Sequence, residues 1–267
     1  MGSNKGEFKI IKGAKNPIIF VGAGPGDPEL ITVKGKKALE NADLIIYAGS
    51  LVPEKMLKWT KDKCERVNSA KLPLELIVRR MVEAYKHGKK VVRVHSGDPS
   101  LYGAIQEQIV ELEKLSIPYE IIPGVTAAFA AAAAMGCEYT LPDISQTLIL
   151  TRVSGRTNVP EDESLRSLAA HKTSMAIYLS ISFVDEVSKI LKESYGKKAH
   201  AVIAYKLSQP GQKIIYTTLE EMPEIVRKEK IGRQALIIVG RVLSVKQSGP
   251  KKRSKVYHKD FSHTFRK

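Results

Sequence analysis

Three segments rich in glycine and proline carry side chains that could bind a ligand, and the first runs from Gly22 to Thr32 (GAGPGDPELIT). Glycine after a strand lets the backbone turn sharply and come close to a ligand. A dinucleotide-binding loop needs the spacing G-x-G-x-x-G, whereas this loop has G-x-G-x-G and then Asp27, which would place negative charge beside a pyrophosphate. Pro25 also removes an amide donor. The loop argues against NAD, and an ordinary tight turn is its simplest alternative.

The other two segments are His95–Gly103 (HSGDPSLYG) and Pro123–Ala127 (PGVTA), and each also follows an apolar run. In the second segment, Asp98 offers a carboxylate to an amine or hydroxyl, or simply caps the helix that follows. In the third, Thr126 is either a ligand contact or a plain helix cap. Ligands bind outside the carboxyl ends of strands in open α/β sheets, so three such loops in one domain are expected to converge on one crevice.

The elements that must position these loops alternate along the first half of the chain. Apolar residues at i, i+3, i+4, i+7 and i+8 from Leu74 predict a helix that ends before Gly88. Strands that alternate with helices indicate βαβ units and a largely parallel sheet. An alanine-rich segment, 127–134, predicts a helix that packs closely. The strands predicted in this half are 17–21, 44–47, 91–94 and 119–122.

The second half repeats the alternation, but the turn Gln209–Gln212 (QPGQ) between two predicted strands indicates an antiparallel pair. A proline-containing connection around 137–144 predicts the domain boundary. The strands predicted here are 147–150, 175–179, 201–204, 213–216 and 236–239. The predicted fold class is therefore α/β, with two α/β domains in tandem. Their ranges are 17–138 and 139–245, with a flexible segment 1–16 before them and a basic tail 246–267 after them.

The charge of the chain is unevenly distributed. Its 267 residues include 43 Lys and Arg against 28 Asp and Glu, a formal net charge of +15. The ends, 1–17 and 246–267, carry +3 and +7, which leaves +5 for the body. Net charge is therefore weak evidence for a nucleic-acid partner, and an aromatic content of 6% offers few stacking surfaces for single strands. We expect no nucleic-acid partner.

Composition also argues against several other classes of protein. The chain is 43% hydrophobic and 27% charged, as globular proteins are. No apolar run approaches the roughly 20 residues of a membrane helix, and the first residues have no apolar signal region. Cys64 and Cys137 lack the spacing of a zinc site or a disulfide framework. We expect a cytoplasmic protein with no membrane partner and no metal bound by the protein.

Taken together and in this order, GAGPGDPELIT, HSGDPSLYG and IIPGVTA resemble the tetrapyrrole methylases, which transfer a methyl group from S-adenosylmethionine (SAM). The resemblance covers residues 18–245. It is greatest to the branch that methylates C-11 of precorrin-4 or cobalt-precorrin-4 in cobalamin biosynthesis. Two segments favour that branch: 148–157 (LILTRVSGRT) and the ending 254–266, in which Val256 stands where the family leads us to expect Leu.

The resemblance implies a homodimer of two-domain subunits, with SAM bound in a cleft between the domains. The family usually has a small residue at the position of Leu207, so a backbone contact is expected there. Matched by motif, the implied SAM-binding residues are Pro25, Gly97, Asp98, Leu101, Tyr102, Thr126, Ala127, Leu179, Leu207 and Ala235.

The implied substrate is a tetrapyrrole with several carboxylates, for which guanidinium groups are good bidentate partners. Arg152 and Arg156 are the first candidates, followed by Lys206 and Arg93. His95 could accept a proton after methylation because histidine titrates near neutrality, or it could be a structural histidine that supports its loop. The one metal expected is an ion inside the substrate ring.

Other functions stay open at this point. A related methyltransferase could act on another precorrin position, on RNA or on a modified protein residue. A nucleotide- or anion-binding module without catalysis would explain glycine loops but not three ordered motifs. An NAD oxidoreductase is disfavoured by the spacing of the first loop.

Overall fold

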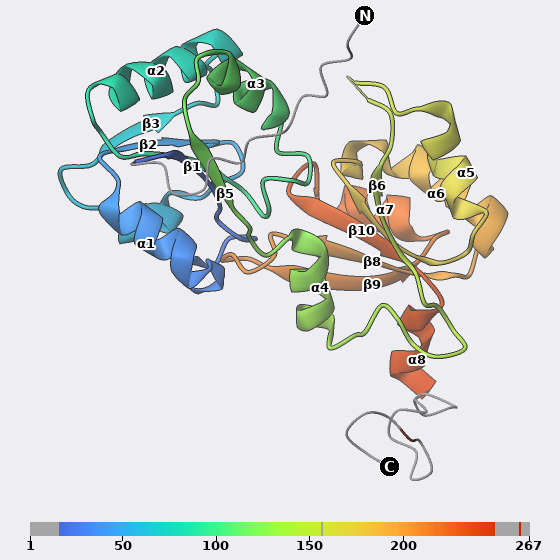
Figure 1. Cartoon of the computed structure of the whole chain (residues 1–267). Coiled ribbons are helices and arrows are strands. Elements are labelled where there is room, and N and C mark those ends of the chain that lie inside the picture. The colour runs from blue at the N-terminus through green and yellow to red at the C-terminus, as the bar shows by residue number, and fades with distance from the viewer. Residues whose placement is uncertain (1–15, 156, 249–261, 263–267) are drawn as a thin grey trace, which may run out of the picture. The chain divides into compact units, whose positions relative to one another are not determined.

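The computed structural model describes residues 16–155, 157–248 and 262. Packing divides the chain into two compact units, Met1–Ala127 and Ala128–Lys267 (Figure 1). The domain boundary expected at 138 lies after the alanine-rich helix, whereas the division by packing places nearly all of that helix in the second unit. The boundary at 138 stays a prediction. The expectations for the segment 1–16 and the tail 246–267 fall almost wholly outside the described residues, although the last helix continues to Ser248.

The first unit is built on a five-stranded sheet in the order β3-β2-β4-β1-β5, and every pair in it is parallel. The parallel sheet predicted from the sequence is confirmed. β3 was not predicted, because it is an edge strand whose Glu65, Arg66 and Asn68 are exposed and gives no apolar pattern. The strands are β1 (Ile18–Gly22), β2 (Leu44–Tyr47), β3 (Glu65–Asn68), β4 (Val91–His95) and β5 (Tyr119–Ile122).

Helices cover both faces of this sheet, α1 on one and α2 with α3 on the other (Figure 1). Side chains of a strand alternate between faces, so Phe20 packs with Met81 of α2 and Leu112 of α3. Val21 packs on the opposite face with Leu39 of α1. The helical segments are α1 (Val33–Asn41), α2 (Leu74–Lys86) and α3 (Gln106–Lys114), with short 3-10 turns η1 (Pro28–Leu30) and η2 (Glu54–Trp59).

The second unit has a mixed five-stranded sheet in the order β6-β7-β10-β8-β9. β6 and β7 are parallel, and the remaining pairs are antiparallel. β8 and β9 are the antiparallel pair predicted from the turn Gln209–Gln212. The strands are β6 (Leu148–Arg152), β7 (Ser174–Tyr178), β8 (His200–Tyr205), β9 (Lys213–Thr218) and β10 (Ala235–Val239).

The helices of the second unit pack on this sheet through one large apolar cluster. Leu165 of α5, Val187 of α6 and Met222 of α7 meet alternate residues of the strands, such as Ile177 and Ile203. The helical segments are α4 (Ala127–Met135), α5 (Leu165–Ala169), α6 (Val184–Tyr195), α7 (Met222–Lys228) and α8 (Val242–Ser248), with the 3-10 turns η3 (Glu161–Glu163) and η4 (Ile181–Phe183).

The alanine-rich segment is the helix α4, as predicted. Ala128, Ala131 and Met135 form its buried face. The chain after it is fixed by two hydrogen bonds: the Tyr139 hydroxyl donates to the Ala128 carbonyl (2.7 Å), and the Ser174 hydroxyl donates to the Tyr139 carbonyl (2.8 Å). Across the described part of the chain, no helix has both the length and the apolarity required to cross a membrane.

Candidate functional site

The three predicted loops leave the carboxyl ends of β1, β4 and β5, and β1 lies between the other two strands. The first and second loops are joined by a short bridge in which Gly97 N donates to Gly24 O (2.8 Å) and Gly24 N donates to Gly97 O (3.2 Å). Ala23 N also donates to the His95 carbonyl (2.8 Å). The convergence expected from the sequence is therefore present within the first unit.

Glycine is required where these loops meet because the backbones approach too closely for any side chain. A Cβ atom at Gly124 would lie 2.1 Å from the Gly97 carbonyl oxygen. A Cβ atom at Gly22 would lie 2.6 Å from the Gly124 nitrogen and 2.7 Å from the same Gly97 oxygen. All of these neighbours are backbone atoms, which cannot swing away as a side chain would. Three glycines from three loops therefore make one junction.

Asp98 ties this junction together through both oxygens of its carboxylate. Its Oδ2 accepts from the backbone nitrogen of Gly124 (2.9 Å). Its Oδ1 accepts from the backbone nitrogen (2.8 Å) and the hydroxyl (2.5 Å) of Ser100. Burial alone would raise the pKa of Asp98, but the hydrogen bonds from Ser100 and Gly124 outweigh it, and the pKa lies below its usual value. The carboxylate is therefore held in its charged form.

Asp98 keeps the capacity to accept a ligand donor as well. A carboxylate has about four acceptor positions, and the bonds from Ser100 and Gly124 use three of them. One acceptor position is therefore left for an amine or hydroxyl donor. Asp27, by contrast, caps the turn η1 by accepting from Glu29 N (2.9 Å).

The other SAM-binding candidates of the first unit differ in accessibility. Tyr102 is 42% exposed and has a left-handed backbone (φ 55°), which costs a non-glycine residue free energy and is common at functional sites. Leu101 and Ala127 are half-buried, and Pro25 and Thr126 are buried. Tyr102 is thus the side chain of this group that is most accessible to a ligand.

Arg93 lies inside the first unit, beneath the second loop. It is only 5% exposed, and its Nε donates to Gln108 Oε1 (3.1 Å) while its Nη1 donates to the Ile46 carbonyl (3.2 Å). Gln108 in turn donates to the Ala104 carbonyl (2.9 Å). Burial lowers the pKa of Arg93 to about 10, so it stays charged at neutral pH. This arrangement supports the loop and gives no support to a substrate contact.

His95 is buried on the same face of β4 as Arg93, with 4% exposure. Its ring stacks on Phe20 with 6.0 Å between ring centroids, and its Nε2 has no hydrogen-bond partner among the described residues. Burial, and then the charge of Arg93, lower the pKa of His95 to about 3. The ring is therefore neutral and a weak base at physiological pH, which favours the structural alternative over the proton acceptor.

The second-unit candidates lie at one end of their sheet. β10 is antiparallel to β7, so Ala235, which begins β10, lies at the same end of the sheet as Leu179, which directly follows β7. Ala235 also pairs with Tyr205, and Lys206 N donates to the Gln234 carbonyl (2.9 Å), which brings Leu207 to the same end.

The candidate residues of the second unit also differ in how exposed their side chains are. Leu179 is 59% exposed with a left-handed backbone (φ 54°), whereas Leu207 is 6% exposed. Lys206, a substrate candidate, also has a left-handed backbone (φ 47°), and its Nζ lies 5.3 Å from the centre of the Tyr205 ring. Leu179 is therefore the exposed side chain among these candidates, whereas Lys206 and Ala235 are half-buried.

The first two substrate candidates give a mixed result. The Arg152 guanidinium donates to carbonyl oxygens of the loop that follows it: Nη1 to Val153 (3.2 Å) and Thr157 (3.0 Å), and Nη2 to Asn158 (3.0 Å). Arg156 lies outside the described residues. No described contact therefore tests Arg156 as a carboxylate partner, and Arg152 is already engaged.

Sequence reasoning missed three residues that hold the loops. Ser100 could have been found, because Asp followed two positions later by Ser is a common turn signature. Gln108 gives no such signal, since its partner Arg93 is distant in the chain. Trp59 is the third, and its indole nitrogen donates to the Pro28 carbonyl (3.3 Å), which fixes the turn η1 within the first loop.

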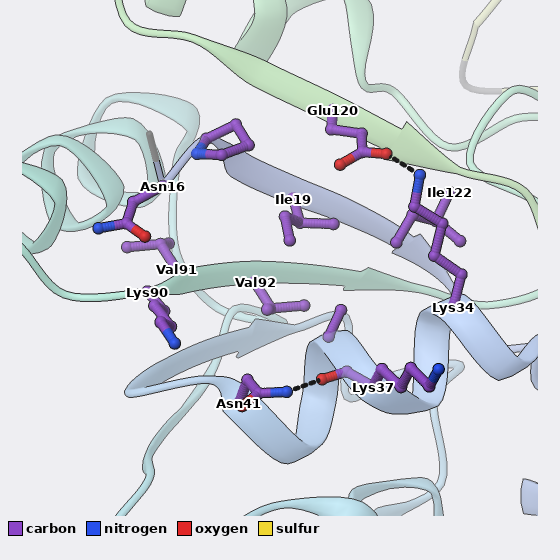
Figure 2. Close-up of a pocket in the computed structure, with 12 residues that line it drawn as sticks. Asn16, Ile19, Lys34, Lys37, Asn41, Lys90, Val91, Val92, Glu120 and Ile122 are labelled. Carbon is purple, nitrogen blue, oxygen red and sulfur yellow. Dashed lines mark hydrogen bonds and ion pairs between the residues drawn. The ribbon is translucent and has the colours of Figure 1, made fainter. Parts of the chain in front are cut away.

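A separate pocket of about 310 Å³ lies along α1 on one face of the first sheet (Figure 2). Ile19 and Val92 line it from the sheet, and Lys34 pairs with Glu120 at its side. Asn16 and Lys90, which precede β1 and β4, line its other end, so the pocket extends toward the amino ends of the strands. It includes no residue predicted to bind SAM or the substrate.

The glycine junction predicts a large effect of one methyl group. Gly124→Ala is expected to lower the free energy of unfolding by about 1–3 kcal/mol, because the added carbon overlaps backbone atoms. Gly232→Ala is the control, since a Cβ there meets nothing within 4 Å. Denaturant unfolding of both variants measures the difference, and equal stabilities would contradict the close approach.

Asp98→Asn is expected to destabilise the protein by about 1–3 kcal/mol at pH 7, because a charge-assisted acceptor is lost. The folded pKa of Asp98 lies below the ordinary aspartate value of 3.8, so its stabilising contribution is present above that pH and is lost as the pH falls through the folded pKa. The difference between variant and parent should shrink below pH 4. Urea unfolding across pH 2.5–7 measures it, with the exposed Asp62→Asn as control; a difference independent of pH would refute the carboxylate tie.

His95→Phe is expected to keep the free energy of unfolding within about 1 kcal/mol, because a ring replaces a ring and no hydrogen bond of Nε2 is lost. His95→Ala should cost about 3 kcal/mol through the cavity it leaves. Thermal unfolding compares the two variants. A stable His95→Phe protein with kcat reduced about 100-fold would instead support a proton-transfer role.

Comparison with known proteins now tests the family expected from the loops. A model of the tetrapyrrole (corrin/porphyrin) methylases matches residues 17–223. The chain is 54% identical over 251 residues to a cobalt-precorrin-4 C(11)-methyltransferase of Methanocaldococcus jannaschii, covering 94% of this chain and 96% of that protein. It is 45% identical over 249 residues to a precorrin-4 C(11)-methyltransferase of Pseudomonas aeruginosa, covering 93% and 98%.

Solved structures agree with the sequences. The X-ray structure of a cobalamin biosynthetic enzyme, cobalt precorrin-4 methyltransferase, matches with a TM-score of 0.83 and 44% identity over 85% of this chain and 95% of that one. A uroporphyrin-III C-methyltransferase of Thermus thermophilus, complexed with S-adenosyl homocysteine, matches with a TM-score of 0.72 and 26% identity over 86% and 99%. The expected family is confirmed: this chain belongs to the tetrapyrrole methylases.

Proposed function

We propose that the chain is a SAM-dependent methyltransferase that methylates C-11 of cobalt-precorrin-4 to give cobalt-precorrin-5 in cobalamin biosynthesis. The observation that carries this proposal is the junction of three loops held by Asp98, which offers a ligand backbone groups and one carboxylate acceptor. The cobalt form is favoured over the metal-free form because the relative at 54% identity is named for the cobalt substrate and the one at 45% for precorrin-4.

The residues proposed to hold SAM come from both units. In the first unit, Asp98 would accept from a SAM amine or hydroxyl, the loops at Pro25, Gly97, Thr126 and Ala127 would supply backbone contacts, and Leu101 and Tyr102 would supply apolar surface. In the second unit, Leu179 would offer an exposed side chain, and Leu207 and Ala235 would offer mainly backbone.

The proposed chemistry needs positioning more than acid or base strength. Bound SAM supplies a methyl group on a positively charged sulfur, which an electron-rich ring carbon of the substrate displaces in line. The role of the protein in this reaction would be to fix the reacting groups in place and to exclude water. The neutral His95 would support the second loop and would not take a proton itself. No protein-bound metal enters this scheme.

Cations of the second unit are proposed to bind the substrate carboxylates. Lys206, which follows β8 directly and precedes Leu207, is one proposed partner. Arg156, in the loop after β6, is proposed as a bidentate partner because planar guanidinium matches carboxylate geometry. We also propose that the enzyme works as a homodimer in the cytoplasm, where Cys64 and Cys137 would remain free thiols.

The test offers labelled SAM together with a cobalt-containing precorrin-4, its metal-free counterpart and total RNA in parallel reactions. Label is expected in the cobalt corrinoid, at C-11 by NMR of the product, with a lower kcat/KM for the metal-free ring. Label at another ring carbon would move the chain to another branch of the family. Label in RNA and none in either corrinoid would overturn the proposal.

A further inference from the structure

Arg152 is the last residue of β6, and its guanidinium donates hydrogen bonds to the loop that follows the strand. Nη1 donates to the carbonyl oxygens of Val153 (3.2 Å) and Thr157 (3.0 Å), and Nη2 donates to that of Asn158 (3.0 Å). The three acceptors span both ends of the segment 153–158. A planar guanidinium carries its donors on separate nitrogens and can bridge acceptors in this way, whereas the three donors of an ammonium group all lie on one nitrogen.

The same loop is fixed from two other directions. Within it, Gly155 N donates to the Thr157 carbonyl (3.2 Å), and Val159 N donates to the Ser154 hydroxyl oxygen (3.1 Å). At its start, Val153 N donates to the Ser180 hydroxyl oxygen (3.0 Å).

Ser180 connects this loop to the neighbouring strand. Its hydroxyl donates to the Tyr178 carbonyl (2.6 Å) at the end of β7. The loop is therefore tied to the strand end that precedes Leu179, where the second-unit candidates gather. Arg152 supplies the part of this network that spans the loop.

We infer that Arg152 is a positioning residue, which holds the loop 153–158 in place for substrate binding and does not itself bind a substrate carboxylate. The inference rests on the proposed function, since the loop carries Arg156, the proposed carboxylate partner. It replaces the expectation that Arg152 meets the substrate directly. Three of the five guanidinium N–H donors already bond to these carbonyls, and an ion pair near the surface returns little free energy for drawing the group away from them.

The first test compares Arg152→Lys with Arg152→Gln. Both variants are expected to raise KM for the tetrapyrrole to a similar extent, about tenfold or more, because lysine keeps the charge but cannot span the loop. Kd for SAM should stay within about twofold. If Arg152→Lys keeps most of the affinity and Arg152→Gln loses it, a direct charge contact is established and the inference is overturned.

Arg227→Gln is the matched control. Arg227 is a surface arginine of the same unit whose Nη1 is paired with the Asp185 carboxylate (2.9 Å). Its loss removes a charge and an ion pair of the second unit without touching the loop. KM and Kd are expected to equal those of the parent.

A double-mutant cycle gives a second, independent measurement. If Arg152 acts through the loop, Arg152→Gln should raise KM in the parent and add nothing further in the Arg156→Ala background. Additive increases would mean that Arg152 contacts the substrate on its own. If Arg156→Ala alone leaves KM unchanged, the proposed carboxylate partner is wrong, and the loop must be judged by a structural measurement.

Hydrogen exchange supplies that measurement without any substrate. The amides of Gly155 and Val159 are hydrogen-bonded within the loop and should exchange faster in both Arg152 variants, while those of β7 remain protected. Unchanged exchange at these two amides would overturn the positioning role whatever the kinetics show. Faster exchange with unchanged KM would show that the loop is fixed by Arg152 but is not used for substrate binding.

Discussion

The close approach of three backbones at Gly22, Gly97 and Gly124 is the constraint on which the first unit depends. Parallel order places β1 between β4 and β5, so the carboxyl ends of these strands meet at one edge. Side chains at the junction would separate the loops, and glycine removes them at a cost in chain entropy. That cost is offset by Asp98, which satisfies the amide of Gly124 and the turn at Ser100 together. Close packing and hydrogen bonding therefore act on the same few residues.

Three charged groups whose chemistry suits ligand binding are used largely to hold the protein itself. Asp98 binds two loop amides, Arg93 binds Gln108 and a strand carbonyl, and Arg152 binds three carbonyls of its own loop. A charge removed from water needs such partners, because an unpartnered one is costly to bury. The proposed ligands would therefore meet mainly backbone and exposed side chains, with one acceptor position left on Asp98.

Sequence reasoning succeeded where a pattern is local. The strands at 44–47 and 119–122 were predicted to the residue because short β-branched runs are bounded by clear turns, and the three loops followed from the strands. It failed for β3, because this polar edge strand has no apolar pattern. It also could not predict the hydrogen-bond partners of Arg152, because these acceptors depend on how the loop folds. The burial of His95 could have been predicted from the sequence. It lies two positions after Arg93 in β4, a strand of a parallel sheet whose two faces are both covered.

Two exposed side chains stand at positions where the backbone is left-handed and therefore strained. Tyr102 and Leu179 both have left-handed backbones, where glycine would be free of strain. Both side chains are also well exposed, at 42% and 59%. A turn alone would be better served by glycine at either place. Contact with the SAM molecule of the proposed reaction would explain why exposed, non-glycine side chains stand at these two strained positions.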